Sequence, residues 1–335
     1  MKLRIPGHTL ILTAAPFAVV FTILLSILYG AKSIDISSVF NAFLHFDAGN
    51  VDHQIITHSR LPRVGGALLV GAFLAVSGAL MQGMTRNDLA SPSIMGITDG
   101  SAFAVTICMI MAPYASSMAM IIASFIGSAL SIVLVFGLAS LLPGGLSPVR
   151  LAILGTLIGT FLSSVSSAMA MYFQVSQNIS FWYNSRLHQM DPQLIMLAVP
   201  FAVVGLVMAM WISKSVTIFS LGEELAVSLG QRTTLVKLTA TLSVILLTGI
   251  SVAIAGKIGF VGLLVPHITR FLTGLDYKWI IPCSAVIGGV FLALCDVLSR
   301  FLNYPFEMPI GVVTAIIGVP YFLYLIRTRG GDSHR

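Results

Sequence analysis

Long apolar runs separated by short polar turns recur along the whole chain. One clear example begins after Arg63 and continues without a charged residue to Thr85, where Arg86 and Asp88 interrupt it. About 20 uncharged, mainly apolar residues are enough for a helix to cross a hydrocarbon core about 30 Å thick. The runs are continuous and do not alternate with polar positions, so they predict spanning helices and not the strands of a transmembrane barrel.

The pattern predicts ten membrane-spanning helices. The apolar run near the N-terminus is longer than the hydrophobic region of a signal peptide, so we expect it to be retained as the first helix. The predicted fold class is an all-α polytopic membrane protein, with residues 1–335 forming one transmembrane domain. The expected spans are 9–29, 64–84, 95–112, 117–141, 149–174, 193–213, 235–255, 258–273, 280–302 and 309–326.

The distribution of cations predicts the orientation of the chain. Ten spans place both termini on one side, and a cytoplasmic N-terminus puts most of the Lys and Arg residues on the inner side, as the positive-inside rule requires. Spans 95–112 and 258–273 are short and interrupted by glycine or proline. Each is the second helix of a group of four, spans 2–5 and 7–10, whose equivalent helices run in opposite directions. This arrangement predicts an inverted repeat.

The composition supports a membrane protein. The chain is 57% hydrophobic and 9% charged, whereas a soluble domain has about 25% charged residues. The net charge is +6, but the 18 lysines and arginines are scattered over the loops, which argues against nucleic-acid binding. Cys108, Cys283 and Cys295 lie in apolar segments without metal-ligand spacing, so we expect packed free thiols.

Motifs for enzymatic chemistry are missing from the sequence. Gly256-Lys257 is followed by Ile258 and has no glycine five positions before it, so it is not a nucleotide-binding loop. Neither GxSxG nor HExxH occurs, which disfavours an intramembrane enzyme. Three histidines share an outer loop without helical spacing, and we expect solvated side chains there and no metal site. They are His45, His53 and His58.

Charged residues within or beside the spans are few. Asp296 and Arg300 are four residues apart on one predicted helix and can pair. Asp99 starts a helix and Glu307 precedes the last span. A proton-driven carrier needs a titrating group in its path, and no carboxylate is expected unpaired in mid-span. A secondary carrier or channel is therefore disfavoured, and a pump without its own ion relay must take its energy from elsewhere.

A polar inner loop is predicted at residues 214–234. Within it, three leucines and an alanine recur on one face of a short helix, two glutamates suit its first turn, and a glycine can end it. The helix either lies on the inner membrane surface or docks into a partner protein. Docking is favoured because Ala226 and Gly230 are small enough to let a partner approach. The segment comprises Leu221, Gly222, Glu223, Glu224, Leu225, Ala226, Leu229 and Gly230.

Small residues form a stripe on the fifth span. Gly155, Gly159, Ser163 and Ser167 follow each other at four-residue spacing. Such a stripe either packs against another helix or faces a wet pathway. The residues alone leave both interpretations open.

Five sequence blocks, read together, carry a family resemblance. The first lies between Arg60 and Gly100 and contains RLPR, SGALMQ and N-x-LASP; the others are LSPVRLAILG (146–155), LGEELAVSLG (221–230), GKIGFVGLLVPHITR (256–270) and PIGVVTAIIGVPYFLYLI (309–326). In this order and spacing they resemble the permease subunits of bacterial ABC importers for iron(III)-siderophores, haem and cobalamin, the FecCD-type family.

The resemblance implies a ten-helix permease in the bacterial plasma membrane. It implies a second permease subunit, identical or related, two ATPase subunits and an extracytoplasmic substrate-binding protein, with membrane lipid around them. Mg-ATP is then bound by the ATPase subunits, and this chain itself binds no cofactor. The expected cargo is a metal chelate moved inward, with a ferric siderophore first and haem or cobalamin as alternatives.

The resemblance also implies roles along the path. The segment at 221–230 becomes the coupling contact with the ATPase. Asn87 and Leu89 match the inner gate region, and Pro148 and Val149 fall at a second constriction before the fifth helix. We expect an apolar, unspecific path, because the spans carry no binding charges. The pathway residues expected on the fifth helix are Gly155, Gly159 and Ser163.

Three arginines match the family's docking positions for the binding protein. Arg60 and Arg63 precede the second span and Arg300 ends the ninth, so we expect all three at the outer surface. Their planar guanidinium groups suit carboxylates of a partner. The alternative is interfacial anchoring to lipid headgroups.

Overall fold

All regular structure in the described part of the chain is helical. The computed structural model describes residues 6–30, 32–142, 148–177, 179, 187, 190, 192–303 and 306–330. The helices are α1 (Gly7–Leu28), α2 (Ile36–Leu44), α3 (Val51–Gln54), the π-helical η1 (Ile55–Arg60), α4 (Leu61–Thr85), α5 (Ile97–Met111), α6 (Ser117–Leu141), α7 (Pro148–Tyr172), α9 (Pro192–Leu221), α10 (Glu223–Ser228), α11 (Thr233–Ala255), α12 (Val261–Thr273), α13 (Tyr277–Ser299) and α14 (Ile310–Gly330).

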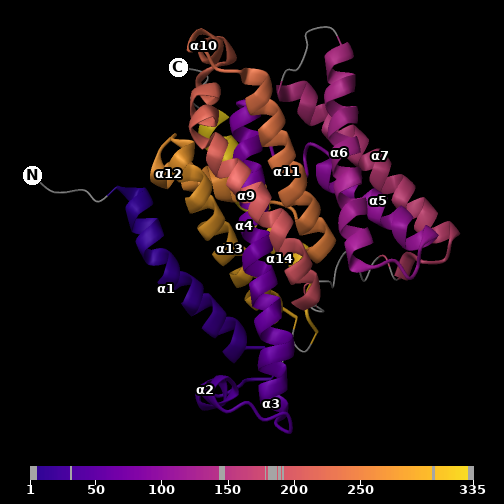
Figure 1. Ribbon diagram of the computed structural model, residues 1–335, viewed down its shortest axis with the longest axis vertical. Coiled ribbons are helices and arrows are strands. Elements are labelled where there is room, and N and C mark those ends of the chain that lie inside the picture. Colours follow the sequence, from indigo (N-terminus) through magenta and orange to yellow (C-terminus); the bar gives the residue numbers. More distant parts are fainter. Residues whose placement is uncertain are drawn as a thin grey trace, which may run out of the picture.

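The predicted fold class is confirmed. Seven helices are long and apolar enough to cross a membrane by length and composition. Three shorter apolar helices, α5, α12 and the first part of α14, fall on the remaining predicted spans. Figure 1 shows an elongated bundle with α10 at one end and α2 and α3 at the other. Following the predicted topology, we call these the inner end and the outer end.

The predicted inner loop, residues 214–234, is shorter than expected. α9 continues to Leu221, so much of the predicted loop is helical. The reason is packing, because Val216 and Phe219 are buried and extend the apolar face of α9 beyond the uncharged run. The segment between α9 and α11 therefore consists of the short helix α10 and two brief connections.

α4 is the central helix of the bundle and is buried along most of its length. Glycines let two other helices reach its backbone. A Cβ atom on Gly71 would lie 2.2 Å from the carbonyl oxygen of Gly288 on α13, and one on Gly78 would lie 1.9 Å from that of Gly262 on α12. Membrane helices use small residues for such approach, so these glycines set the crossings of α4 with α12 and α13.

The helix directions agree with the predicted inverted repeat. α4 runs from the outer to the inner end, where Gly83 lies against Tyr277 at the start of α13. α11, the equivalent of α4, starts beside α10 and runs the opposite way. The short helices α5 and α12 share a further feature: each follows a residue in the left-handed region, Gly96 (φ 72°) and Phe260 (φ 68°).

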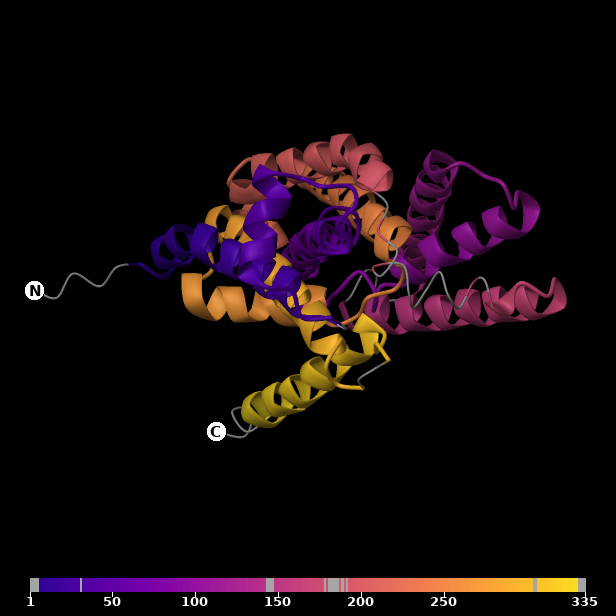
Figure 2. The same cartoon turned by 90° about the horizontal axis from the view of Figure 1, so that it is seen from below.

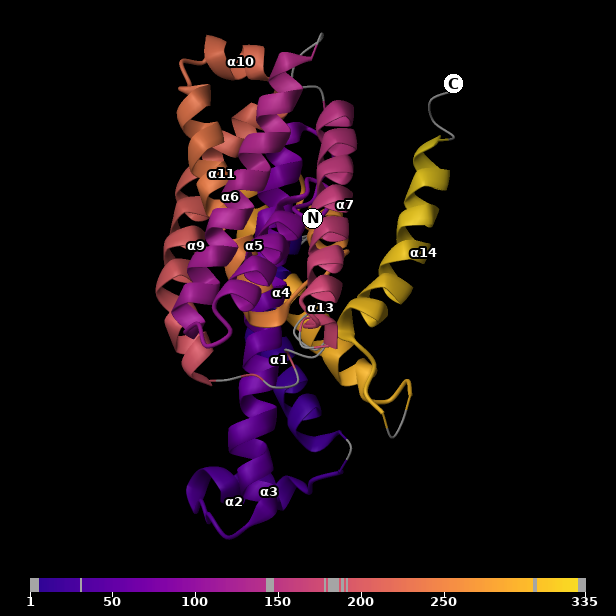
Figure 3. The same cartoon turned by 90° about the vertical axis from the view of Figure 1, so that its right-hand side faces the viewer.

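Two parts of the bundle extend from the central group. Figure 2 shows α5, α6 and α7 together on one side, with α14 projecting away from the body. In Figure 3, α14 and α7 are separate rods. Both helices leave large apolar side chains exposed, including Leu157 and Phe161 on α7 and Ile316 and Leu323 on α14. These faces have no protein partner within the described part of the chain.

Candidate functional site

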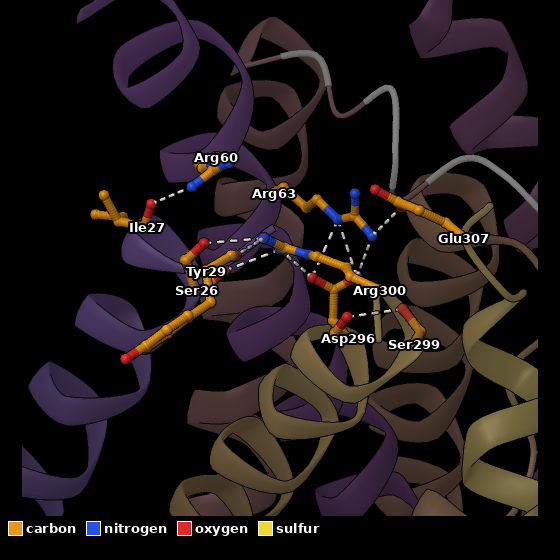
Figure 4. Close-up of polar contacts among 9 residues, drawn as sticks. All are labelled: Ser26, Ile27, Tyr29, Arg60, Arg63, Asp296, Ser299, Arg300 and Glu307. Atoms are coloured by element: carbon orange, nitrogen blue, oxygen red, sulfur yellow. Dashed lines mark hydrogen bonds and ion pairs between the residues drawn. The ribbon is translucent and has the colours of Figure 1, made fainter. Parts of the chain in front are cut away.

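A cluster of three arginines lies at the outer end, where α1, α4 and α13 meet (Figure 4). Arg63 on α4 binds Asp296 on α13 with both ends of its guanidinium: Nε lies 2.9 Å from Oδ1 and 3.0 Å from Oδ2, and Nη2 lies 2.8 Å from Oδ1. Nη2 also lies 2.8 Å from Oε2 of Glu307, in the connection to α14. Arg63 therefore ties three parts of the chain together.

The other two arginines hold the C-terminal end of α1. Arg300 donates from Nη1 to the carbonyls of Ser26 (2.9 Å) and Tyr29 (3.1 Å), and Arg60 donates to those of Ile27 and Lys32. The last carbonyls of a helix have no partner within it and carry partial negative charge. Cationic side chains satisfy them, so α1 is fixed to the core through its end.

The prediction that these arginines are exposed is wrong. Arg60, Arg63 and Arg300 are 6%, 7% and 4% exposed, because the end of α1 and two carboxylates surround them. The predicted pairing of Asp296 with Arg300 is confirmed at 2.5 Å. Docking of a binding protein to the arginines remains a prediction.

At the inner end, a polar network joins the turn after α4 to α12. Arg270 donates to Oδ1 of Asp88 (2.6 Å) and to Oε1 of Gln82 (2.7 Å). Gln82 in turn donates to the carbonyl of Leu263 (3.1 Å). The turn contains the predicted gate residues Asn87 and Leu89, and the backbone N–H of Leu89 donates to Oδ1 of Asn87 (3.0 Å). Their gate role remains a prediction, but α12 holds the turn in place.

The coupling segment has a face different from the one predicted. Ala226 is 0% exposed, because α10 packs this side against its own chain, and it is not available to a partner. A lysine of α11 fixes the helix: Lys237 Nζ lies 2.6 Å from Oε1 of Glu223. Glu224 is exposed, and Gly222 and Gly230 (φ 147° and 78°) form the turns at the two ends. The exposed apolar face consists of Leu221 (65%), Leu225 (44%), Val227 (56%) and Leu229 (62%).

The glycines of α7 pack against the segment before α5. A Cβ atom on Gly155 would lie 2.5 Å from the carbonyl oxygen of Ile94, and one on Gly159 would lie 2.6 Å from Oδ2 of Asp99. The packing interpretation of the stripe therefore applies to these two residues. Pro148 and Val149 begin α7, but their side chains lie outside the described residues.

Beside these glycines, α7 forms one wall of a cavity of about 700 Å³. Its lining residues mainly bear hydroxyl groups, and the pathway role of Gly159 and Ser163 remains a prediction. At its edge, Lys257 Nζ lies 2.7 Å from Oδ1 of Asp99 and 3.1 Å from Oγ of Ser163. The lining residues are Ser93, Ile94, Asp99, Thr156, Gly159, Thr160, Ser163, Ser164 and Ser167.

Comparison with known proteins identifies the family to which this chain belongs. Residues 18–328 match the FecCD transport family. The chain belongs to the FecCD transport family. Within this family it is 61% identical to the iron-uptake system permease protein FeuB of Bacillus subtilis over 97% of both chains. It is also 48% identical to the iron(3+)-hydroxamate import system permease protein FhuB of the same organism, over 97% of this chain and 84% of FhuB.

A solved structure has the same fold as this FecCD protein. It is a metal-chelate type ABC transporter in an inward-facing conformation, with a TM-score of 0.79 and 28% identity, covering 96% of this chain and 99% of the other. The fold and the transport family therefore agree. The chain is a membrane permease of the ABC transporter type.

Sequence reasoning missed the charged pairs that connect the two halves of this FecCD protein. The sequence analysis assigns Lys257 no partner and expects Asp99 only to start a helix. They are 158 residues apart, and Arg270 and Asp88 are 182 apart. The sequence feature that could have indicated these pairs is the position of each charged residue in or beside a short, interrupted span. A single sequence does not show which residue each of these charges pairs with.

Proposed function

We propose that this FecCD permease moves a ferric siderophore inward across the bacterial plasma membrane as one subunit of an ABC importer. The observation that carries the proposal is the 61% identity with the iron-uptake permease FeuB along nearly the whole of both chains. A more distant relative, FepD of Escherichia coli, is named as a ferric enterobactin permease and is 33% identical. Haem and cobalamin are the alternative cargoes.

Energy for transport comes, in this proposal, from two separate ATPase subunits that bind Mg-ATP. The sequence has no nucleotide-binding loop. The exposed apolar side chains on and beside α10 support a contact at the inner end, since such a group of large apolar side chains is unfavourable in water. The coupling segment is thus Leu221–Gly230, with its contact face formed by the leucines.

A second permease subunit, identical or related, completes the path. The unpartnered apolar faces of α7 and α14 support this, because the cavity beside α7 would otherwise present hydroxyl groups to lipid. Facing subunits would enclose the polar wall between them. In this arrangement Ser163 lines the path, and Gly155 and Gly159 let α7 pack closely against the segment before α5. The inner turn with Asn87 and Leu89 closes the path. Pro148 and Val149 form the entry to α7.

The substrate-binding protein docks at the outer end. The arginine cluster supports this through its charge: Arg63 and Arg300 pair with the carboxylates Asp296 and Glu307, and Arg60 adds a third guanidinium group bound to backbone carbonyls, which leaves an excess positive charge for acidic groups of a partner. The side chain of Glu307 is 24% exposed and marks the accessible edge of the cluster. Docking then acts through the rim around Arg63 and not through freely exposed arginines.

Uptake in cells tests the proposal. A bacterial strain lacking this chain, but retaining the other subunits of its importer, is supplied with ⁵⁵Fe-labelled siderophores, with haem and with labelled cobalamin. We expect loss of uptake of at least one ferric siderophore and its recovery on re-expression. Unchanged siderophore uptake together with loss of haem or cobalamin uptake would favour those cargoes. Unchanged uptake of all three would contradict the proposal.

A further inference from the structure

The cavity beside α7 has the chemistry of a ligand site. Its volume of about 700 Å³ falls within the range of about 300–1,000 Å³ that is usual for small-molecule pockets. Five hydroxyl groups of α7 lie on the wall facing it, spaced so that they share one side of the helix. They are Thr156, Thr160, Ser163, Ser164 and Ser167.

Hydroxyl groups suit an oxygen-rich guest. Each can donate one hydrogen bond and accept others, and its hydrogen rotates to fit the partner. Thr156 and Ser167 donate to carbonyls one turn earlier on α7, and an oxygen of a guest can replace those acceptors. Such contacts are individually weak, which allows a guest to leave as easily as it enters.

A charged pair at the edge of the cavity can respond to the charge of a guest. Lys257 and Asp99 neutralise each other when the cavity holds no guest. Asp99 has little freedom to move, because its Oδ2 lies against Gly159. A Cβ atom added to Gly159 would be only 2.6 Å from that oxygen. Lys257 has a flexible four-carbon stem. The ammonium group is therefore the partner that can turn toward a guest.

The pair is also accessible for exchange. Its side chains are 27% and 23% exposed, so a guest in the cavity can reach both groups. An anionic oxygen in the cavity offers Lys257 the same charge as the carboxylate of Asp99. Ser163 lies on the cavity wall and accepts a hydrogen bond from the same ammonium group at 3.1 Å. Its hydroxyl group can keep this bond when the ammonium group turns toward the guest.

We propose that this cavity is a holding site for an anionic, oxygen-rich metal chelate, in which Lys257 exchanges Asp99 for an anionic oxygen of the cargo. The inference rests on the proposed function and adds to it the charge class of the cargo and the residues that select it. An apolar groove of about 380 Å³, formed by α5, α6 and α7, lies beside it with almost purely hydrocarbon lining, including Phe103 and Leu162. The polar cavity is thus a local feature and not a general property of this region.

The first test measures the electrostatics of the cavity without any cargo. Ser164→Cys provides a thiol on the cavity wall, in a chain carrying Cys108→Ala; Cys283 and Cys295 are buried and stay. Its rates of reaction with an anionic and a cationic methanethiosulfonate reagent are compared in the complete importer. Lys257→Gln should lower the anionic-to-cationic rate ratio by roughly two- to fivefold, and Asp99→Asn should raise it. Lys278→Gln removes the same charge at the inner end and should leave the ratio unchanged.

The second test measures cargo. Uptake of ⁵⁵Fe is followed with an anionic ferric tris-catecholate and an uncharged ferric trihydroxamate. We expect Lys257→Gln to lower Vmax for the anionic chelate severalfold, Lys257→Arg to retain most of it, and any hydroxamate uptake to change little.

The two tests separate this inference from the proposed function. An unchanged thiol rate ratio in Lys257→Gln overturns the holding site whatever the importer carries. A changed ratio with undiminished uptake of the anionic chelate also overturns it, and so does a wild-type importer that takes up the uncharged chelate alone. In this last case the proposed function stands. Failure of the wild-type importer to take up any ferric chelate would refute the function instead.

Discussion

Arg63 and Asp296 lie 233 residues apart and form a buried, bidentate ion pair that joins α4 to α13. Removing one partner of such a pair leaves an uncompensated charge, at a cost of about 3–5 kcal/mol. Asp296→Leu should therefore lower the melting temperature of the purified permease by many degrees. The double variant Arg63→Met/Asp296→Leu should recover only part of the loss, because it removes the charge of Arg63 but leaves Arg300 buried without its carboxylate partner. Size-exclusion chromatography after heating measures both, and equal melting of Asp296→Leu and wild type would contradict the role.

The glycines on α4 give a matched pair of substitutions on one helix. Gly78→Ala places a methyl group against the carbonyl of Gly262, whereas Gly65 has nothing within 4 Å of an added Cβ atom. Overpacking of this kind costs about 1–3 kcal/mol. We expect Gly78→Ala to lower the thermal stability and Gly65→Ala to leave it at or above the wild-type value. The same melting assay decides, and equal effects would show that the crossing of α4 with α12 is not tight.

The proposed contact with the ATPase can be tested on the exposed leucines at α10 and at its end. Leu225→Glu or Leu229→Glu should reduce co-purification of the ATPase subunit, since central apolar contacts of an interface are worth about 2 kcal/mol or more. Ser228→Glu, an exposed change on the same helix, is the control and should have a smaller effect. Wild-type recovery of the ATPase with both leucine variants would show that α10 lies on the membrane surface instead.

Replacing Arg270 should loosen the turn after α4 at the inner end. Its two hydrogen bonds, to Asp88 and Gln82, need the planar fork of a guanidinium group, which lysine lacks. Arg270→Lys should therefore increase the rate at which a cysteine at position 89 reacts with a soluble thiol reagent, and Arg270→Ala should increase it further. Uptake should fall in the same order. Unchanged reactivity in both variants would show that the turn is held by other contacts.

Features that depend on local pattern could be predicted from the sequence. Continuous apolar runs located the spans, and α6 begins and ends at the predicted residues 117 and 141. Spacing of four residues on one helix predicted the pair of Asp296 with Arg300. The helical periodicity of segment 221–230 placed Ala226 on the same face as the leucines, whereas in the structure Ala226 is buried and the leucines are exposed. Periodicity alone does not indicate which side of a short helix packs against its own chain.

The remaining features depend on contacts between distant segments. Nothing local in the sequence indicates that Arg63 meets Asp296, or that Lys257 meets Asp99, because each partner is on the other half of the chain. The three arginines at the outer end resemble surface residues in the sequence for the same reason. Their carbonyl partners at the end of α1 become visible when α1, α4 and α13 are assembled.

Transport by purified components is the most direct test of the central claim, that this chain forms the path for a ferric siderophore driven by a separate ATPase. The chain is reconstituted in proteoliposomes with its partner permease and ATPase subunits, with the binding protein and a ⁵⁵Fe-siderophore on one side and Mg-ATP on the other. We predict accumulation of ⁵⁵Fe that requires both Mg-ATP and the binding protein and is lost with Leu225→Glu/Leu229→Glu. Accumulation driven by a proton gradient without ATP, or equal accumulation in liposomes lacking this chain, would contradict the account.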